Sequence, residues 1–571
     1  MSILKLGRVL RASVFALALP GLATSGAHAL EEIGENLEIS GEVFVLTELT
    51  WGDTSGPKTF NIFTDAGGGS TLPATAFVGA PYPVNLDRYD TLTAFRTEIL
   101  VEASYRGIPH FTPVIKLRPY FDGSFGIEGK HDQIQRDWET NISDGLHDEW
   151  DPLVREAYVD VNYHPFFVRA GRQIVTWGRS DGVSVMDVVN PRNFRNPLTF
   201  EQERFQIPQW MINATWDMSK YEWLPLGISK ELQVVWNMDY LPSRFPGFRP
   251  EENGLHPWTL NVVDLADQII QASRNLFNEA DFFDGDKYKR GDFWDNSEVF
   301  VRWRGRTGSD LGPLSDLTYS FHYGHLYNDV PLYNLSDVRI DAGLPFTIAG
   351  PRAIGGGIDF EKRRYDLYGV SFDKALTFLP GQLEGTVIRG EVAYNSGDSF
   401  YNPDFELEKH DNLTFLIGLD QYLYLSPRSW VETPWFTSFQ FWHDQILHKP
   451  EIGDTTKIGS VSCNAQPGCG DAGYVIGSAF NLFNGMRDES RSIVTLYMFN
   501  DFLPGKTLRV ELFGLHEFEG GGSWFRGLVG YTFNSWISAR VGTNIVWGPR
   551  DGFFGEFKKN DSVFTELKFT F

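Results

Sequence analysis

The last nine residues, Val563-Phe-Thr-Glu-Leu-Lys-Phe-Thr-Phe571, alternate between two kinds of side chain. One face carries Val563, Thr565, Leu567, Phe569 and Phe571, and the other carries Phe564, Glu566, Lys568 and Thr570. Successive side chains of a strand point to opposite sides, so a period of two that ends on an aromatic residue is typical of a strand with one face in lipid. The stretch therefore predicts the final strand of a transmembrane β-barrel.

The opposite end of the chain has the features of an export signal. Three basic residues (Lys5, Arg8 and Arg11) precede the apolar run 9–19, and small residues around Ala29 offer a cleavage site. We therefore expect residues 1–29 to be a secretory signal and residues 30–571 to form the barrel. Export combined with a lipid-facing strand predicts a location in the outer membrane of a Gram-negative cell.

Composition agrees with a barrel and argues against a helical membrane protein. Apolar residues make up 42% of the 571 residues and mean hydropathy is negative, whereas each spanning helix needs about 20 consecutive apolar residues. Aromatic residues reach 15%, which fits two aromatic girdles at the membrane interfaces. A secreted sandwich or propeller is the alternative, but the repeat of about 40 residues that a propeller needs is missing from the sequence.

The chain is strongly acidic. Its formal net charge is −24, and removal of the three basic signal residues would take it to −27. This charge argues against nucleic acid as a partner. On a barrel, excess carboxylate is expected in the lumen and in external loops, where divalent cations bridge it to lipopolysaccharide. The expected partners are therefore outer-membrane lipid and lipopolysaccharide, and no cofactor is implied.

Alternating segments recur along the whole mature chain and number about 18. The predicted strands are 37–51, 91–106, 111–125, 152–163, 165–177, 205–217, 230–240, 297–306, 315–328, 363–376, 383–396, 412–424, 433–447, 490–502, 506–518, 523–533, 536–547 and 560–571. Long connections such as 52–90 alternate with short ones such as 107–110. Long external loops and short periplasmic turns require an even strand number, so the range is 16 to 20.

Two loop features stand apart from the strand pattern. Residues 262–277 carry apolar side chains at helical spacing, which predicts one short amphipathic helix in the longest external loop. Cys463 and Cys469 flank a Pro-Gly turn in an oxidising compartment, which predicts a disulfide. Two thiols without a nearby histidine make a poor metal site, so no metal is expected.

Charged residues of both signs gather on one hairpin and the loop that follows it. The predicted inward residues of the hairpin are Glu156, Tyr158, Asp160, Arg169 and Gln173, and the candidate charged residues of the loop are Arg179, Asp181, Asp187, Arg192 and Arg195. We interpret residues 178–204 as a constriction that folds back into the barrel, because charged rings set selectivity in wide pores. A structural plug or an external loop fits equally well. Arg172 falls on the lipid side by strict alternation, and a bulge at Gly171 or a place near the membrane interface would accommodate it, so its orientation stays open.

These residues also carry a family resemblance. The quoted stretches are AYVDVN (157–162), VRAGRQIVTWGRSDG (168–182), DVVNPRNFR (187–195), RGEVAY (389–394) and LIGLDQ (416–421). Together they resemble the large proteobacterial outer-membrane β-barrel family that is known only as a domain of unknown function and is itself similar to substrate-selective porins. The resemblance implies an outer-membrane location and a transport role linked with hydrophobic compounds. It brings no catalytic residues with it.

Enzymatic readings find little support in the sequence. Walker and zinc-protease motifs do not occur. His322 and His325 are three residues apart in a predicted strand, which puts them on opposite faces and argues against a shared metal. The remaining candidates for a general base are His147-Asp148, His410-Asp411 and His443-Asp444. Such dipeptides arise by chance in an acidic chain, so we expect no enzyme.

The function that the sequence predicts is a porin-like channel for passive or facilitated passage of small molecules, hydrophobic compounds among them. One alternative is a plugged barrel that acts as a surface adhesin or scaffold, and another is a sheath for a periplasmic carrier. The barrel-assembly machinery is an expected partner through the last strand, which ends at Phe571. A homo-oligomer is left open, as is the identity of the solute.

Overall fold

The computed structural model describes residues 36–50, 92–122, 154–178, 183–192, 205–221, 227–238, 240–243, 296–309, 311–329, 332–333, 339–341, 347–349, 360–401, 407–425, 433–448, 489–548, 554, 557 and 560–571. Within these ranges, no helix is both long enough and apolar enough to cross a membrane. The predicted signal 1–29, the predicted helix 262–277 and the predicted pair Cys463–Cys469 lie outside the described residues.

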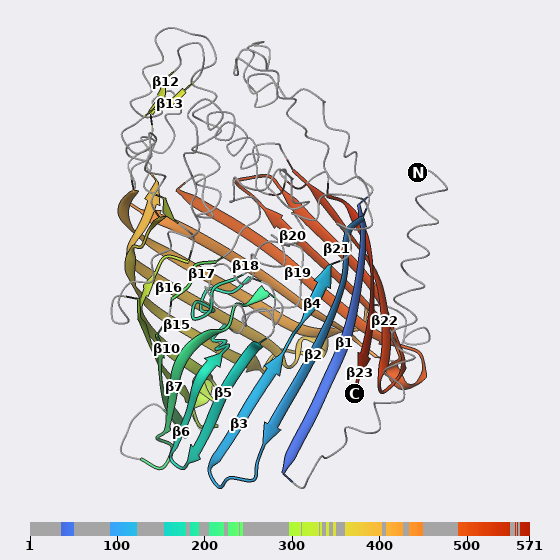
Figure 1. Cartoon of the computed structure of the whole chain (residues 1–571), viewed down its shortest axis with the longest axis horizontal. Helices are drawn as coiled ribbons and strands as arrows, with labels where there is room; N and C mark the ends of the chain where they lie inside the picture. Colours follow the sequence, from blue (N-terminus) through green and yellow to red (C-terminus); the bar gives the residue numbers. More distant parts are fainter. Residues whose placement is uncertain are drawn as a thin grey trace.

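The described chain forms one closed antiparallel barrel (Figure 1). Its strands are β1 (Leu37–Thr50), β2 (Leu92–Tyr105), β3 (Phe111–Leu117), β4 (Tyr120–Asp122), β5 (Val154–Tyr163), β6 (Phe166–Gln173), β7 (Gln209–Asp217), β8 (Ser229–Asn237), β9 (Glu298–Arg306), β10 (Thr318–Tyr327), β15 (Arg364–Leu376), β16 (Thr386–Tyr401), β17 (Leu407–Leu423), β18 (Trp435–Leu447), β19 (Ser490–Phe502), β20 (Leu508–Glu517), β21 (Ser523–Asn534), β22 (Ile537–Trp547) and β23 (Ser562–Thr570). Because β3 and β4 are two parts of one spanning strand, the barrel has 18 strands, which confirms the prediction.

Small elements occupy the connections. In the described ranges, two two-stranded sheets lie outside the barrel sheet: β11 (Leu332–Tyr333) with β14 (Phe360–Glu361), and β12 (Arg339–Asp341) with β13 (Thr347–Ala349). Figure 1 shows β12 and β13 beyond the rim of the barrel. Among the described residues, the single-turn 3-10 helices Gly312–Leu314, Gly381–Leu383 and Pro504–Lys506 follow strands. Short turns such as 503–507 therefore alternate with long connections, as the sequence predicts.

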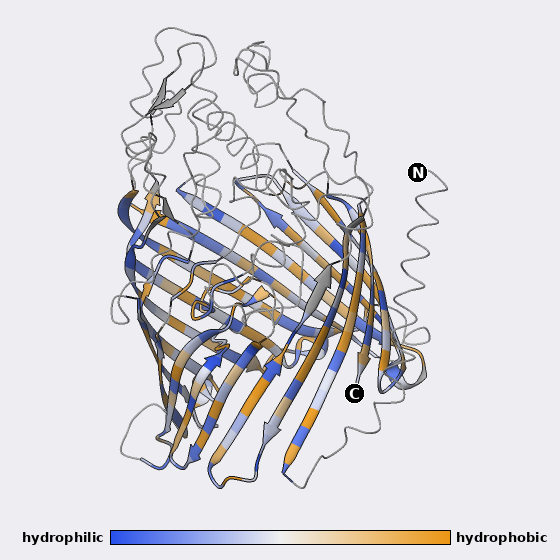
Figure 2. Ribbon diagram, in the orientation of Figure 1, coloured by the Kyte–Doolittle hydropathy of each residue, from blue (hydrophilic) through white to orange (hydrophobic). Residues whose placement is uncertain are grey.

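The two faces of the wall differ in polarity, which is visible as alternating colours along the strands (Figure 2). On β17 the outward Ile417 is 47% exposed and its neighbour Leu416, which points inward, is 1% exposed. Outward apolar residues of this kind recur on nearly every strand, whereas inward positions carry most of the charge. An apolar outer face around a closed sheet is what a lipid bilayer requires, so the barrel lies in the outer membrane.

The barrel closes where the last strand meets the first. Gly41 and Phe571 exchange two backbone hydrogen bonds of 2.9 Å, and the Phe571 ring lies where a side chain on Gly41 would sit. Inward from this seam, Lys568 pairs with Glu42. The two faces that the sequence predicts for residues 563–571 are therefore confirmed by the pairing of β23 with β1.

Charged side chains on neighbouring strands pair across the inner wall. Glu566 on β23 lies 3.6 Å from Arg526 on β21 and 3.4 Å from Arg540 on β22. The ring of Phe564 covers Gly542 in the strand between them, at a place where a Cβ would clash with it. Ion pairs of this kind keep this part of the inner wall polar while the paired charges offset one another.

Two predicted strands on either side of the charged loop are wrong at one end. The predicted strand 165–177 stops at Gln173, and the predicted strand 205–217 begins only at Gln209. Pro208 lacks an amide hydrogen for the ladder, and the apolar residues after Gln173 pack against the interior of the barrel instead of continuing along its wall. Periodicity alone does not distinguish an apolar residue in a strand of the wall from one that packs in the interior of the barrel.

The outer face gives a test of membrane placement. Val541 is 54% exposed in the middle of β22, so Val541→Arg should lower the free energy of unfolding by about 2–4 kcal/mol, because it moves a charge into hydrocarbon. Urea unfolding of the barrel in lipid vesicles measures this. Val541→Leu is the matched control and should stay within about 0.5 kcal/mol of the parent. Equal stability of the two variants would place Val541 outside the lipid-facing belt.

Candidate functional site

Between β6 and β7 the chain leaves the wall and enters the lumen. We call residues 174–178 and 183–192 the inner segment. Asn190 closes its stem: its side-chain oxygen accepts from the Val175 amide at 2.7 Å, and its side-chain nitrogen donates to the carbonyls of Gln173 (3.3 Å) and Ile207 (2.9 Å). The Ile207 amide also donates to the Pro191 carbonyl at 2.8 Å. One buried amide therefore ties the departing chain to the returning chain.

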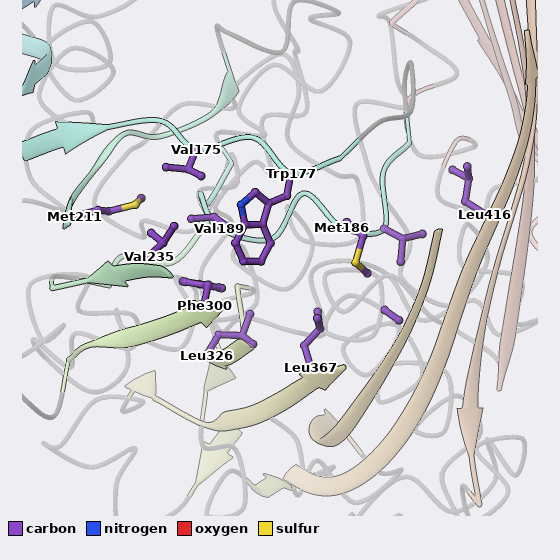
Figure 3. Packing of buried hydrophobic residues seen from close by; sticks show 12 residues of the cluster. Val175, Trp177, Met186, Val189, Met211, Val235, Phe300, Leu326, Leu367 and Leu416 are labelled. Atoms are coloured by element: carbon purple, nitrogen blue, oxygen red, sulfur yellow. The ribbon is translucent and has the colours of Figure 1, made fainter. Parts of the chain in front are cut away.

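The inner segment docks on an apolar row of the inner wall (Figure 3). The row consists of one inward residue from each of seven neighbouring strands, namely Met211, Val235, Phe300, Leu326, Leu367, Ala393 and Leu416. None of the seven is more than 1% exposed. Against them pack Val175, Trp177, Val185, Met186 and Val189 of the segment. Since burial of one such side chain stabilises by about 1.5–3 kcal/mol, this contact holds the segment on the wall.

Trp177 is the largest side chain of this contact. Its indole nitrogen donates to Gln233 at 2.9 Å, and its ring meets Phe300 edge-on at 5.9 Å and His322 at 5.2 Å. The Arg302 guanidinium lies 5.6 Å from the ring centre. The polar edge of the indole is therefore satisfied while its apolar body is buried, as a buried tryptophan requires.

Met186 and the residues beside it are held by one carboxylate. Glu391 on β16 is 1% exposed and accepts hydrogen bonds from the amides of Val185 (2.8 Å) and Met186 (3.0 Å) and from the Ser184 hydroxyl (3.3 Å). Gly369 makes room for Met186, because a Cβ there would lie 2.5 Å from the Met186 sulfur. Hydrogen bonds to an ionised acceptor are about twice as strong as neutral ones, so Glu391 acts as a latch for the segment.

Asp187 and Arg192 connect the inner segment to its surroundings. Asp187 accepts from Gln206 at 2.7 Å and lies 3.6 Å from Arg192, whose guanidinium also donates to the Asp187 carbonyl at 3.0 Å. The Arg192 amide donates to the Ser243 hydroxyl at 2.9 Å, and the Ser243 amide donates to the Asp329 carbonyl at 2.8 Å. The segment is thereby linked to the residues that follow β8 and β10.

Asp329 lies just beyond the end of β10 and faces this pair of charges. Burial raises the pKa of the Asp329 carboxyl to about 7, with Arg192 lowering it and Asp187 raising it. The side chain therefore changes charge near neutral pH. Arg192 and Asp187 both belong to the inner segment.

The predicted inward residues of the hairpin form a connected set on the wall. Arg169 donates to both oxygens of Asp160 at 2.7 and 2.9 Å, and its guanidinium lies 3.9 Å from the centre of the Tyr158 ring. Glu156 pairs with Lys116 at 3.3 Å. The structure thus brings four of the candidate residues together on β5 and β6.

The other candidate residues have different surroundings. Gln173 is completely buried under the inner segment and donates to the Met211 carbonyl at 3.0 Å. Arg172 stands opposite Ala157 and Trp210 on the outward row, yet it is buried, and its Nε donates to the Arg155 carbonyl at 3.0 Å. The pairing of β5, β6 and β7 shows no register shift at Gly171, so the suggested bulge is wrong. Candidates Arg179, Asp181 and Arg195 lie outside the described residues.

Sequence reasoning missed the receiving side of this contact. Glu391 belongs to the stretch 389–394 and Leu416 to the stretch 416–421, two of the segments on which the family resemblance rests. Both contact the inner segment, which overlaps two further stretches, 168–182 and 187–195. These stretches are far apart in the sequence, yet all of them resemble the same family. That shared resemblance was the signal from which a contact between them could have been predicted.

In the described ranges, the histidine and carboxylate side chains that the sequence singles out have separate partners in the structure. Three or more His, Cys, Asp and Glu side chains do not come together there in a metal-binding group. His322 accepts or donates to Ser371 on the inner face, and His325 pairs with Asp366 at 2.8 Å on the other. His443 contacts Ser492, whereas Asp444 contacts Asn412 and Thr414.

The fold and this site define an outer-membrane β-barrel with a segment of chain docked inside it. A family model described as "Protein of unknown function (DUF1302)" matches residues 11–571, so the chain belongs to this family. Among the curated proteins compared with it, none matches.

The chain is also similar to several solved structures. Pseudomonas aeruginosa OccK3 (OpdO) has 11% identity and a TM-score of 0.39 over 95% of this chain and 97% of its own. A BenF-like porin from Pseudomonas fluorescens Pf-5 has 8% identity and a TM-score of 0.42 over 95% and 99%. Acinetobacter baumannii OccAB3 has 7% identity and a TM-score of 0.41 over 94% and 99%.

The latch gives a prediction that does not depend on function. Glu391→Ala leaves two buried amides without their acceptor, which should loosen residues 183–192 by on the order of 3 kcal/mol and speed their amide exchange about 100-fold. Hydrogen-exchange mass spectrometry in detergent measures this. Glu391→Gln, which keeps an acceptor oxygen, should have a smaller effect, and Glu566→Gln on the far wall should leave the segment unchanged. Unaltered exchange in Glu391→Ala would refute the latch.

Proposed function

We propose that this protein is a porin-like channel of the outer membrane, whose solute path runs along the inner wall opposite the inner segment. The observation that carries the proposal is the unequal exposure of the two walls. The row under the inner segment is buried, whereas inward charged side chains elsewhere reach water: Glu102 is 40% exposed, Lys568 is 38% exposed and Arg509 is 46% exposed. Charged residues in contact with water along a barrel interior are what a hydrated path requires.

In this proposal residues 178–204, which include residues 178 and 183–192 of the inner segment, act as the constriction. The charged residues assigned to the constriction are Arg179, Asp181, Asp187, Arg192 and Arg195, with Glu156, Tyr158, Asp160, Arg169 and Gln173 on the supporting hairpin. Support comes from the docking of the segment inside the barrel and from the pairing of Asp187 with Arg192. A docked segment narrows the lumen while the charged residues around it set ion preference.

Further parts of the proposal concern partners and cargo. Divalent cations bridge the acidic exterior of the protein to lipopolysaccharide. The barrel-assembly machinery recognises the last strand, which ends at Phe571. Small molecules pass, hydrophobic compounds among them, and the lumen carries out no reaction on them. Assembly into a homo-oligomer is compatible with this role.

Liposome swelling with sugars of graded size tests the channel directly. Swelling rates that fall steeply with solute size are expected from the purified barrel, because a constriction sieves solutes. The alternatives are a plugged barrel that serves as adhesin or scaffold and a sheath for a periplasmic carrier. Swelling no faster than that of protein-free liposomes would favour one of these and remove the channel.

Charge removal at the constriction gives a second measurement. Joint replacement Arg179→Gln and Arg195→Gln should shift ion selectivity toward cations and change single-channel conductance by about twofold or more, because two positive charges leave a narrow path. Planar-bilayer recordings report both quantities. Arg306→Gln is the control, since Arg306 pairs with Asp316 at the end of β9, away from the inner segment. Currents that match the parent in size and preference would rule out the charged constriction.

A further inference from the structure

A second apolar surface lies on the inner wall, away from the inner segment. It consists of Tyr422 on β17, Phe436 on β18, and Tyr497 and Phe499 on β19, which we call the aromatic patch. Strand pairing places it inside: the four residues share a face with Leu416, which belongs to the apolar row, and with Trp442, which packs against the same cluster. Their neighbours Phe439 and Leu496 are exposed on the opposite, outer face.

The rings of the patch contact one another around Phe436. The centre of its ring lies 5.4 Å from that of Tyr422, 6.3 Å from that of Tyr497 and 5.1 Å from that of Phe499. The rings of Tyr497 and Phe499 are 5.9 Å apart. These separations fall in the range of favourable aromatic pairs, so the four side chains form one continuous surface on three adjacent strands.

The patch differs from the first apolar row in its contact with water. Every residue of the row is at most 1% exposed because the inner segment covers it. Tyr422 is 58% exposed, and Phe436, Tyr497 and Phe499 are half-buried. Four aromatic side chains held partly in water on a channel wall cost free energy, and a ligand that covers them recovers part of it.

The charges around the patch are mostly paired with each other. Arg509 donates to both oxygens of Asp501 at 2.7 and 2.9 Å, and its guanidinium lies 4.6 Å from the centre of the Phe499 ring. Asp420 pairs with Arg389 on the other side. The Tyr497 hydroxyl donates to Glu511 at 3.4 Å. No strong net field therefore favours either sign of ligand charge, and ring stacking is left as the main source of recognition.

We propose that the aromatic patch is a binding site for planar aromatic rings of permeating solutes. This deepens the proposed channel function and rests on it. A flat ring of the solute stacks on Phe436 and its neighbours. Water leaves the surfaces of the ring and of the patch where they come into contact, and the solute later dissociates and continues along the path. A saturated ring of the same size buries similar area but lacks the quadrupole that favours offset or edge-on stacking. The patch therefore prefers aromatic over aliphatic rings.

The experiment compares L-phenylalanine with L-cyclohexylalanine, which have the same charges and similar size. Saturation-transfer NMR on the detergent-solubilised full barrel measures binding, and current block in planar bilayers measures passage. Phenylalanine should bind and block about 2- to 12-fold better than cyclohexylalanine, which is the range that aromatic pairing supplies. Phe436→Leu, and separately Tyr497→Leu, should reduce this preference toward 1. Phe439→Leu, on the outer face of the same strand, should keep it.

NMR binding tests the aromatic site, and current block tests the channel function. Equal binding of both probes to the parent protein, or a preference that survives both Phe436→Leu and Tyr497→Leu, overturns the aromatic site. Preferential NMR binding that Phe436→Leu removes supports the site even in a barrel that passes no current, and in that case only the channel function fails.

Discussion

Every backbone amide within the hydrocarbon must find a partner inside the protein, and the rest of this structure depends on that requirement. The pairing of β23 with β1 meets it by removing the open edges of the sheet. Once the sheet is closed, the pleat sends alternate side chains to lipid and to lumen. Irregular backbone is then tolerated only in the lumen, where water and inward side chains are available as partners.

The inner segment is such irregular backbone, and its partners are specific. Asn190 serves the amide of Val175 and two carbonyls at the stem, and Glu391 serves the amides of Val185 and Met186. Burial against the apolar row holds the inner segment on the wall, but hydrophobic attraction does not specify an orientation. The hydrogen bonds of Asn190 and Glu391 fix the position of the segment. A buried carboxylate without donors would be costly, so the latch requires the segment to be in place as much as the segment requires the latch.

The architecture could be read from the sequence because each strand records its own environment. Alternation at 563–571 or 490–502 is decided locally by lipid on one side and water on the other, and β19 spans Ser490–Phe502 as expected. The docking of the inner segment is not decided locally. Val175 and Trp177 continue the alternation of β6, and only the row on seven distant strands shows why they leave the wall. Glu391 looks like any other lumen carboxylate until its three donors are seen.

Apolar side chains on an inner wall need a reason, because much of this wall carries paired charges such as Glu566 with Arg526 and Arg540. The apolar row of seven residues is explained by the protein itself, because the inner segment covers the row and removes it from water. The aromatic patch is not covered to the same degree, since Tyr422 is 58% exposed. The apolar row is covered and therefore serves as a structural contact. The aromatic patch is partly exposed to water, which suits the proposed contact with a passing solute. In the proposed channel, a solute that moves along the exposed wall meets paired charges, which bind it weakly, and then the proposed aromatic site, which holds it longer. Selectivity of this kind needs no net charge in the lumen, because the stacking surface distinguishes solutes by the shape and electronic character of their rings.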